Sequence, residues 1–219
     1  MRLLELFKGT GSIGDAFEKR GFEVVSVDID KKSQATHTAD VNVWDYKQYP
    51  PGFFDCIWAS PPCTEYSVAK TTGKRDLVSA DALVAKTLEI IDFFKPVCWL
   101  FENPGTSLLK NREVVAGIPF ALLTYCKYAT GDFPGYRKLT AIWNNVGYVP
   151  RHVCCKACPC DFVAIGRHPV CAQRGPARGR AGRDDRFTVR QLYRMPPALC
   201  DELAEVCWQR CVDAEQDLA

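Results

Sequence analysis

The chain has 219 residues, a length that suits one domain of moderate size with room for a small appendage. Its hydrophobic content of 47% is enough for an ordinary core, and its apolar runs are all shorter than a membrane span. The first residues read as a buried strand rather than as a signal peptide. The composition therefore predicts an intracellular protein with no membrane partner.

The charge is small overall but unevenly distributed. The formal net charge is +2, whereas residues 167–194 carry eight arginines against two aspartates. A basic, glycine-containing segment indicates a surface that binds the phosphates of a nucleic acid; the alternative is a solvated loop that needs charge for solubility. The arginines expected to contact a phosphate backbone are Arg174, Arg178, Arg180 and Arg183.

Cysteines are numerous, and five of the twelve lie between Cys154 and Cys171. This clustering, which includes a pair separated by two residues, is more typical of a metal site than of a secreted disulfide framework. We hypothesise a structural zinc ion held by Cys155, Cys158, Cys160 and Cys171, with His168 or Cys154 as substitute ligands. The alternative is a set of reduced thiols in an irregular loop.

The N-terminal part of the chain predicts a unit that binds a nucleotide. Residues 2–7 read as a strand, a turn with the spacing GxGxxG follows, and a helix runs to about Arg20 and is ended by Gly21. A second strand at 23–28 ends in Asp28, where an acid can bind ribose hydroxyls. Glycine turns also serve tight packing, and the motif does not separate NAD from S-adenosylmethionine.

The remaining elements extend this unit into one sheet. Apolar runs predict strands that end at 39–41 and strands at 53–58, 97–101, 122–126 and 139–143. A helix is expected from Ser79 or Asp81 to Phe94, with Leu83, Val84, Leu88, Ile91 and Phe94 in the core. Two further helices are expected at 188–194 and from Pro196, the latter burying Leu199, Leu203, Val206 and Cys207. The pattern predicts an α/β fold with a doubly wound, mostly parallel sheet.

Three parts of the chain are expected on this basis. Residues 1–149 would form the catalytic domain that binds the nucleotide. Residues 150–187 would form a small recognition segment rich in cysteine and arginine, and residues 188–219 would be helices that pack back on the catalytic domain.

A proline-stiffened turn follows the strand at 53–58 and presents Cys63. Pro61 and Pro62 restrict the backbone and so fix the direction of the cysteine. Glu102 comes at the end of the next strand. Because the carboxyl ends of parallel strands meet at one edge of a sheet, we expect Cys63, Glu102 and the glycine turn to share one crevice. Taken alone, Cys63 could be a buried apolar thiol, the usual environment of a lone cysteine.

These motifs, in this order, resemble the DNA cytosine-5 methyltransferase family. The resemblance rests on Phe7-Lys-Gly9-Thr-Gly11, Asp28, Ala39-Asp40-Val41, Ser-Pro-Pro-Cys63 and Glu102-Asn103-Pro104, and it covers roughly residues 1–145. It implies a Rossmann-like fold that binds S-adenosylmethionine, and double-stranded DNA as the partner. The variant Ser-Pro-Pro-Cys63-Thr-Glu-Tyr-Ser looks closest to viral and phage members, which would place the protein in the cytoplasm or nucleus of a host.

The resemblance also assigns roles to residues. Cys63 would be the nucleophile that attacks the cytosine, Glu102 the proton donor to the ring, and Arg137 a cation near the flipped base. The residues expected around the cofactor are Phe7, Gly9, Thr10, Gly11, Asp28, Ile29, Asp40, Val41 and Pro61. From position alone, Asp40 could accept a hydrogen bond from an exocyclic amine or could be an ordinary loop aspartate.

The sequence departs from the family in two places and leaves other functions open. Thr64 replaces the usual glutamine after the nucleophile, and Pro104 replaces the usual valine after Asn103. The alternatives are a methyltransferase that acts on cytosine in RNA such as tRNA, a catalytically silent DNA-binding homologue, and a dinucleotide-dependent oxidoreductase. The oxidoreductase would leave Cys63 and Glu102 without a role.

Overall fold

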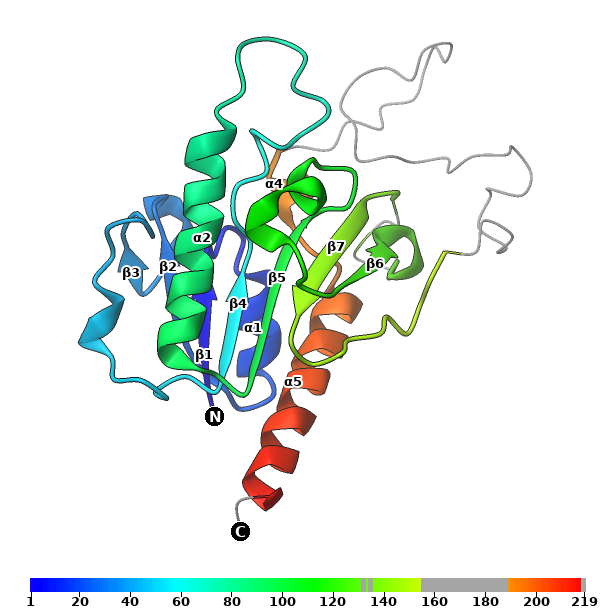
Figure 1. Cartoon of the computed structure of the whole chain (residues 1–219). Helices are drawn as coiled ribbons and strands as arrows, with labels where there is room; N and C mark the ends of the chain where they lie inside the picture. The colour runs from blue at the N-terminus through cyan, green and yellow to red at the C-terminus, as the bar shows by residue number, and fades with distance from the viewer. Residues whose placement is uncertain (131–132, 134–135, 155–188, 218–219) are drawn as a thin grey trace.

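The computed structural model describes residues 1–130, 133, 136–154 and 189–217 (Figure 1). Its strands are β1 (Arg2–Leu6), β2 (Glu23–Asp28), β3 (His37–Thr38), β4 (Cys56–Ala59), β5 (Cys98–Pro104), β6 (Phe120–Thr124) and β7 (Leu139–Asn144). Its helices are α1 (Ser12–Glu18), α2 (Leu77–Phe94), α4 (Val189–Tyr193) and α5 (Pro197–Asp217).

The strands form one seven-stranded sheet in the order β3-β2-β1-β4-β5-β7-β6. The first five strands in this order run parallel, and β7 lies antiparallel between β5 and β6. The order along the chain reverses between β1 and β4, which pair directly with Leu6 opposite Ala59. Ligands bind outside the carboxyl ends of strands at such a reversal, so the glycine turn after β1 and the Cys63 loop after β4 flank the expected position.

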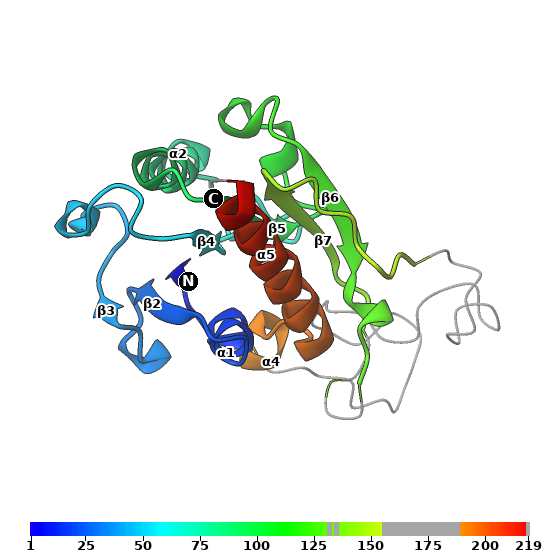
Figure 2. The same cartoon turned by 90° about the horizontal axis from the view of Figure 1, so that it is seen from below.

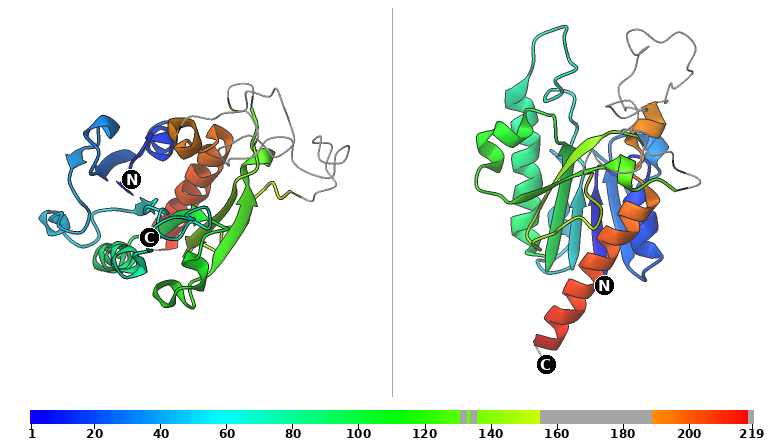
Figure 3. Two further views of the ribbon diagram at one scale, coloured as in Figure 1. Left: turned by 90° about the horizontal axis from the view of Figure 1, so that it is seen from above. Right: turned by 90° about the vertical axis from the view of Figure 1, so that its right-hand side faces the viewer.

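Helices cover both faces of the sheet, as Figures 2 and 3 show. On one face, a hydrophobic core packs α2 against the sheet through Val84, Ile90 and Phe94. On the other face, a second core packs α1 and α5 against the sheet through Phe17 and Leu203. Strands buried on both faces need near-continuous apolar runs, which is why Cys56–Ala59 is buried throughout. The predicted α/β fold with a doubly wound, mostly parallel sheet is confirmed.

The structure corrects several predicted boundaries. Helix α2 begins at Leu77, and its cap is Asp76, whose side chain accepts a hydrogen bond from the Ser79 amide at 3.0 Å. The predicted caps Ser79 and Asp81 were therefore wrong, because each lies within the helix. Strand β3 ends at Thr38, so Asp40 and Val41 follow the strand rather than end it. Strand β4 begins at Cys56, later than the predicted start at residue 53. Strand β6 begins at Phe120, earlier than the predicted start at residue 122.

Most of the predicted helix cores are confirmed. Val84, Ile91, Phe94, Leu199, Leu203 and Cys207 are buried, whereas Leu83, Leu88 and Val206 are half-buried. Helix α1 ends at Glu18 with Lys19 as its C-cap, earlier than the predicted end at Arg20. Gly21 follows with a φ of 85°; its amide bonds to the Glu18 carbonyl, and the Phe22 amide bonds back to the Phe17 carbonyl. Among the described residues, no helix is long and apolar enough to cross a membrane.

Helix α5 is fixed to the segment after β7 by a buried carboxylate. Glu202 is only 4% exposed, and its Oε1 accepts hydrogen bonds from the hydroxyls of Tyr148 (2.7 Å) and Tyr128 (3.3 Å) and from the amide of Arg151 (3.0 Å). A buried acid with these donors is satisfied in place. Glu205, one turn along the helix, forms only half-exposed ion pairs with Arg20 and Arg151.

We therefore expect Glu202→Ala to lower the free energy of unfolding by roughly 2–4 kcal/mol, because buried donors are left unpaired. The matched variant Glu205→Ala should change it by about 0–1 kcal/mol, since exposed ion pairs contribute little. Urea unfolding followed by circular dichroism measures both values. Equal effects of the two substitutions would show that the Glu202 contacts do not hold α5 in place.

Candidate active site

The glycine turn after β1 is fastened to the end of β2. The Gly9 amide donates to Oδ2 of Asp28 at 2.7 Å, and the Asp30 amide donates to Oδ1 at 2.7 Å. Phe7, Gly9 and Gly11 have φ values of 60°, 54° and 74°, a left-handed conformation that glycine adopts without strain. The turn is thus fixed next to a carboxylate at a strand end, and two of its positions, Gly9 and Gly11, carry no side chain.

The other residues expected around the cofactor lie along the same edge. Ile29 directly follows β2 and is 70% exposed, so an apolar face is presented to solvent. Oδ1 of Asp40 accepts hydrogen bonds from the amide and the side chain of Asn42, which makes it a turn residue as well. Val41 is buried in the core, and the Thr10 hydroxyl bonds with that of Ser12 at 2.9 Å.

Sequence reasoning missed Glu5, which lies beneath the glycine turn. Its Oε1 accepts a hydrogen bond from the Gly14 amide at 3.2 Å, whereas its Oε2 is buried with no partner among the described residues. Burial raises the pKa of Glu5 to about 7. A Cβ atom on Gly14 would lie 2.7 Å from Oε2, so this third glycine of the motif permits close packing of helix and strand. The signal in the sequence is an acid in a strand buried on both faces.

The loop that follows β4 is braced from several directions. The Asn103 side chain donates to the carbonyl of Pro61 at 3.1 Å, as an amide that orders this turn would. The Tyr66 hydroxyl donates to Asp81 of α2 at 2.8 Å, and the Leu108 amide donates to the Tyr66 carbonyl at 2.9 Å. These contacts hold the half-buried Cys63 between β4, α2 and the segment after β5.

Glu102 lies close enough to Cys63 to affect the ionisation of its thiol. Glu102 is 8% exposed, and its Oε1 has no hydrogen-bond partner among the described residues. Burial raises the pKa of Glu102, and the positive charge of Lys138 opposes this rise. Burial and the negative charge of Glu102 raise the pKa of Cys63, again opposed by Lys138. The structure thus brings a thiol, a carboxyl that favours its protonated form and a cation together.

The cation of this group is Lys138, whereas the prediction named its neighbour Arg137. Lys138 Nζ donates to the Leu192 carbonyl at 3.1 Å and lies 4.9 Å from the centre of the Tyr125 ring. The Arg137 side chain is exposed. Side chains alternate along an extended segment, and Glu102 pairs with Ile142, so the alternate positions 140 and 138 lie on the Glu102 face. That alternation is the signal that identifies Lys138.

The remaining predicted residues lie outside the described part of the chain. These are the zinc ligands Cys155, Cys158, Cys160 and Cys171, the substitute ligand His168, and the arginines Arg174, Arg178, Arg180 and Arg183. The zinc site and the phosphate-contacting arginines stay predictions.

The opposite effects of Glu102 and Lys138 on the pKa of Cys63 can be tested by substitution. Alkylation of Cys63 by iodoacetamide, measured by mass spectrometry of its peptide, should rise with pH around a midpoint above the usual pKa of cysteine. Glu102→Gln should move the midpoint to lower pH because a negative charge is removed. Lys138→Gln should move it to higher pH because the thiolate loses its nearby cation.

Arg137→Gln is the matched control, since it removes a cation whose side chain is exposed. It should leave the midpoint where it is in the wild type. A profile that responds to Arg137→Gln and not to Lys138→Gln would contradict this assignment of the cation.

Comparisons with known proteins agree with the geometry. A family model described as C-5 cytosine-specific DNA methylase matches residues 1–118, a range that contains the glycine turn, Cys63 and Glu102. A curated protein of Frog virus 3 (isolate Goorha), named "Probable DNA (cytosine-5)-methyltransferase", is 35% identical over 228 residues. That alignment covers 94% of this chain and 100% of the viral protein.

A solved structure, that of the Entamoeba histolytica methyltransferase EhMeth, is similar with a TM-score of 0.48 and 13% identity. The similarity covers 70% of this chain and 56% of that one. The family match and the extent of the viral alignment show that the chain belongs to the C-5 cytosine-specific DNA methylase family.

Proposed function

We propose that this protein methylates carbon 5 of a cytosine in double-stranded DNA through a covalent bond between Cys63 and carbon 6 of the ring. Membership of the family supports the assigned reaction. The effect of the buried Glu102 carboxyl on the Cys63 thiol is the observation that supports the mechanism. A cytosine inside a duplex is stacked, so the base must be flipped out to reach this site. Because DNA is the substrate, we place the protein inside a cell, that of a host if the protein is viral.

The edge of the sheet has the donor set for S-adenosylmethionine, the methyl donor that the family implies. The glycine turn gives a backbone cradle, and the Asp28 carboxylate beside it suits ribose hydroxyls. We assign the exposed Ile29 to the adenine face, together with Phe7, and Asp40 and Val41 to the adenine edge. When bound, the cofactor supplies an electrophilic methyl group on a sulfonium.

The protein's own groups then activate the cytosine. The Cys63 sulfur forms a bond to carbon 6, and Glu102 donates its proton to ring nitrogen 3 so that the ring electrons are not left as a free anion. Carbon 5 becomes nucleophilic and takes the methyl group. Loss of the carbon 5 proton to water then restores the double bond and releases the Cys63 thiolate, and ring nitrogen 3 returns its proton to the Glu102 carboxylate.

One proton serves two purposes in this scheme. Ionised Glu102 raises the pKa of Cys63, so a protonated Glu102 both supplies the ring nitrogen and removes a charge that opposes the thiolate. Lys138 lowers the pKa values of both groups and so stabilises the thiolate. We assign to Lys138 the role that the family resemblance implied for Arg137.

Covalent trapping tests this function. Wild-type protein should form an adduct with duplex DNA that contains 5-fluorocytosine, dependent on S-adenosylmethionine, because fluorine at carbon 5 cannot leave as a proton does. Cys63→Ser should form none, and Cys126→Ser, which changes another half-buried cysteine, should trap as well as the wild type. Denaturing gels measure the adduct.

Other outcomes of this experiment separate the competing functions. Trapping on RNA with 5-fluorocytosine but not on DNA would favour the RNA methyltransferase. DNA binding without any adduct would favour the silent homologue, and trapping by Cys63→Ser would refute the role of Cys63.

The basic segment makes a separate prediction about affinity. Each phosphate contact adds about 0.9 to the slope of log K against log salt, so Arg178→Glu, Arg180→Glu and Arg183→Glu together should flatten it by about 3. The control reverses three exposed lysines elsewhere, Lys19, Lys47 and Lys95, with the same change in net charge. Fluorescence anisotropy across a salt series gives the slopes. Equal slopes in both variants would refute specific contacts by these arginines.

A further inference from the structure

A cluster of cysteines lies at the opposite end of the sheet from Cys63. Cys56 is the first residue of β4 and Cys98 is the first residue of β5, whereas Cys63 follows the last residue of β4. Cys207 and Cys211 come from α5. All are buried, with exposed fractions of 0% for Cys56, Cys98 and Cys207 and 2% for Cys211. The proposed reaction uses none of them.

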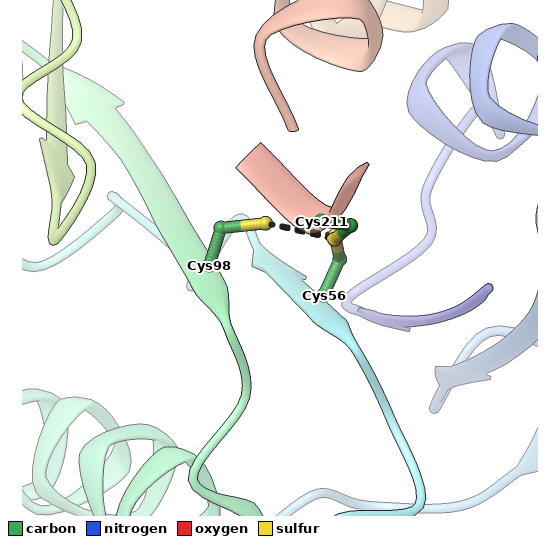
Figure 4. A group of neighbouring side chains, drawn as sticks. All are labelled: Cys56, Cys98 and Cys211. Atoms are coloured by element: carbon green, nitrogen blue, oxygen red, sulfur yellow. Dashed lines mark hydrogen bonds between the residues drawn. The ribbon is translucent and has the colours of Figure 1, made fainter. Parts of the chain in front are cut away.

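The sulfur atoms point toward one another, as Figure 4 shows for three of them. Cys56 Sγ lies 2.9 Å from Cys98 Sγ and 3.5 Å from Cys211 Sγ, and the Cys98–Cys211 separation is 3.8 Å. Cys98 Sγ also lies 3.8 Å from the backbone carbonyl of Cys207, whose thiol interacts with those of Cys56 and Cys98. The sulfurs of Cys56, Cys98 and Cys211 therefore all lie within 4.8 Å of one another, and the Cys207 thiol adjoins this group through Cys56 and Cys98.

The backbone dictates this convergence. Cys56 and Cys98 are directly opposite in the parallel pairing of β4 and β5, so their side chains point to the same face. Cys207 and Cys211 are four residues apart on α5, a spacing that places both on one side of a helix. Packing of α5 on that face of the sheet then brings the two pairs together.

Four thiolates in a small volume are the ligand set of a tetrahedral metal site. With Zn–S bonds of about 2.3 Å, the sulfurs of a tetrahedron lie about 3.8 Å apart. The Cys56–Cys211 and Cys98–Cys211 separations of 3.5 and 3.8 Å agree with that spacing, and the Cys56–Cys98 pair would open on binding. A disulfide between Cys56 and Cys98 would use only half of the group and leave the helix sulfurs without a role.

We propose that Cys56, Cys98, Cys207 and Cys211 bind one Zn²⁺ ion that fastens α5 to the sheet. This site is separate from the zinc site predicted between Cys155 and Cys171. Four thiolates around the ion leave a net negative charge, and Arg210, which neighbours Cys211, brings a positive charge near Cys98. The ion would connect the C-terminal helix to the strands whose far ends carry Cys63 and Glu102.

Zinc analysis of protein purified under reducing conditions, without a polyhistidine tag, tests the site. Cys207→Ala/Cys211→Ala should hold one zinc equivalent fewer than the wild type. Cys200→Ala is the matched control, because Cys200 is another buried cysteine on α5 outside the cluster, and its zinc content should equal that of the wild type. The same loss of one equivalent is expected when the parent chain carries Cys155→Ser/Cys158→Ser, which separates the two sites.

A second experiment needs no variant and remains decisive if the double variant fails to fold. In the wild type, the four cysteines should resist alkylation until a chelator is added and then react together, while Cys200 stays protected. A zinc content that the double substitution leaves unchanged would overturn the proposal. So would wild-type protein without zinc, or a Cys56–Cys98 disulfide found by peptide mass spectrometry of protein prepared without reductant.

Discussion

The proposed chemistry depends on the buried carboxyl of Glu102 lying close enough to Cys63 to raise the pKa of its thiol. Burial of this carboxyl, which is 8% exposed, raises its pKa and so favours the protonated form that can donate a proton. Burial also raises the pKa of Cys63, and an ionised Glu102 would raise it further. An ionised Glu102 would therefore lower the fraction of Cys63 present as the reactive thiolate. The positive charge of Lys138 lowers the pKa values of both groups and so limits the rise that burial causes.

The sheet makes this arrangement possible. Strands β1, β4 and β5 are neighbours, so the glycine turn, the cysteine loop and Glu102 leave the sheet side by side. Asn103 follows Glu102 and bonds to the Pro61 carbonyl, which joins the acid-bearing strand to the loop that carries the nucleophile. Lys138 directly precedes antiparallel β7, which pairs with β5 on the side away from β4. The order of the strands thus determines where these groups lie, and the loops determine only their final direction.

The sequence predicted the order of the elements because buried strands and the glycine turn leave clear patterns, and β2 was placed at its observed bounds. It was less informative where tertiary contacts decide. Asp76 was overlooked as a cap because Ser79 and Asp81 fit the same rule. Arg137 was named from its match to the family's basic motif, whereas the side-chain direction of Lys138 follows from the pairing with β5. The cysteine cluster was invisible, since Cys56, Cys98 and Cys211 are far apart in the chain and meet only through sheet register and helix packing.

The central claim is that burial raises the pKa of Glu102 above that of an ordinary glutamate. Infrared difference spectra of the wild type minus Glu102→Gln, recorded across a pH series, isolate the carboxyl band of this one residue. The account predicts a protonated band that disappears at a midpoint clearly above the usual pKa of glutamate, about 4.3. A midpoint at or below that value would contradict it. An ionised Glu102 could not protonate the ring, and its charge would raise the pKa of Cys63.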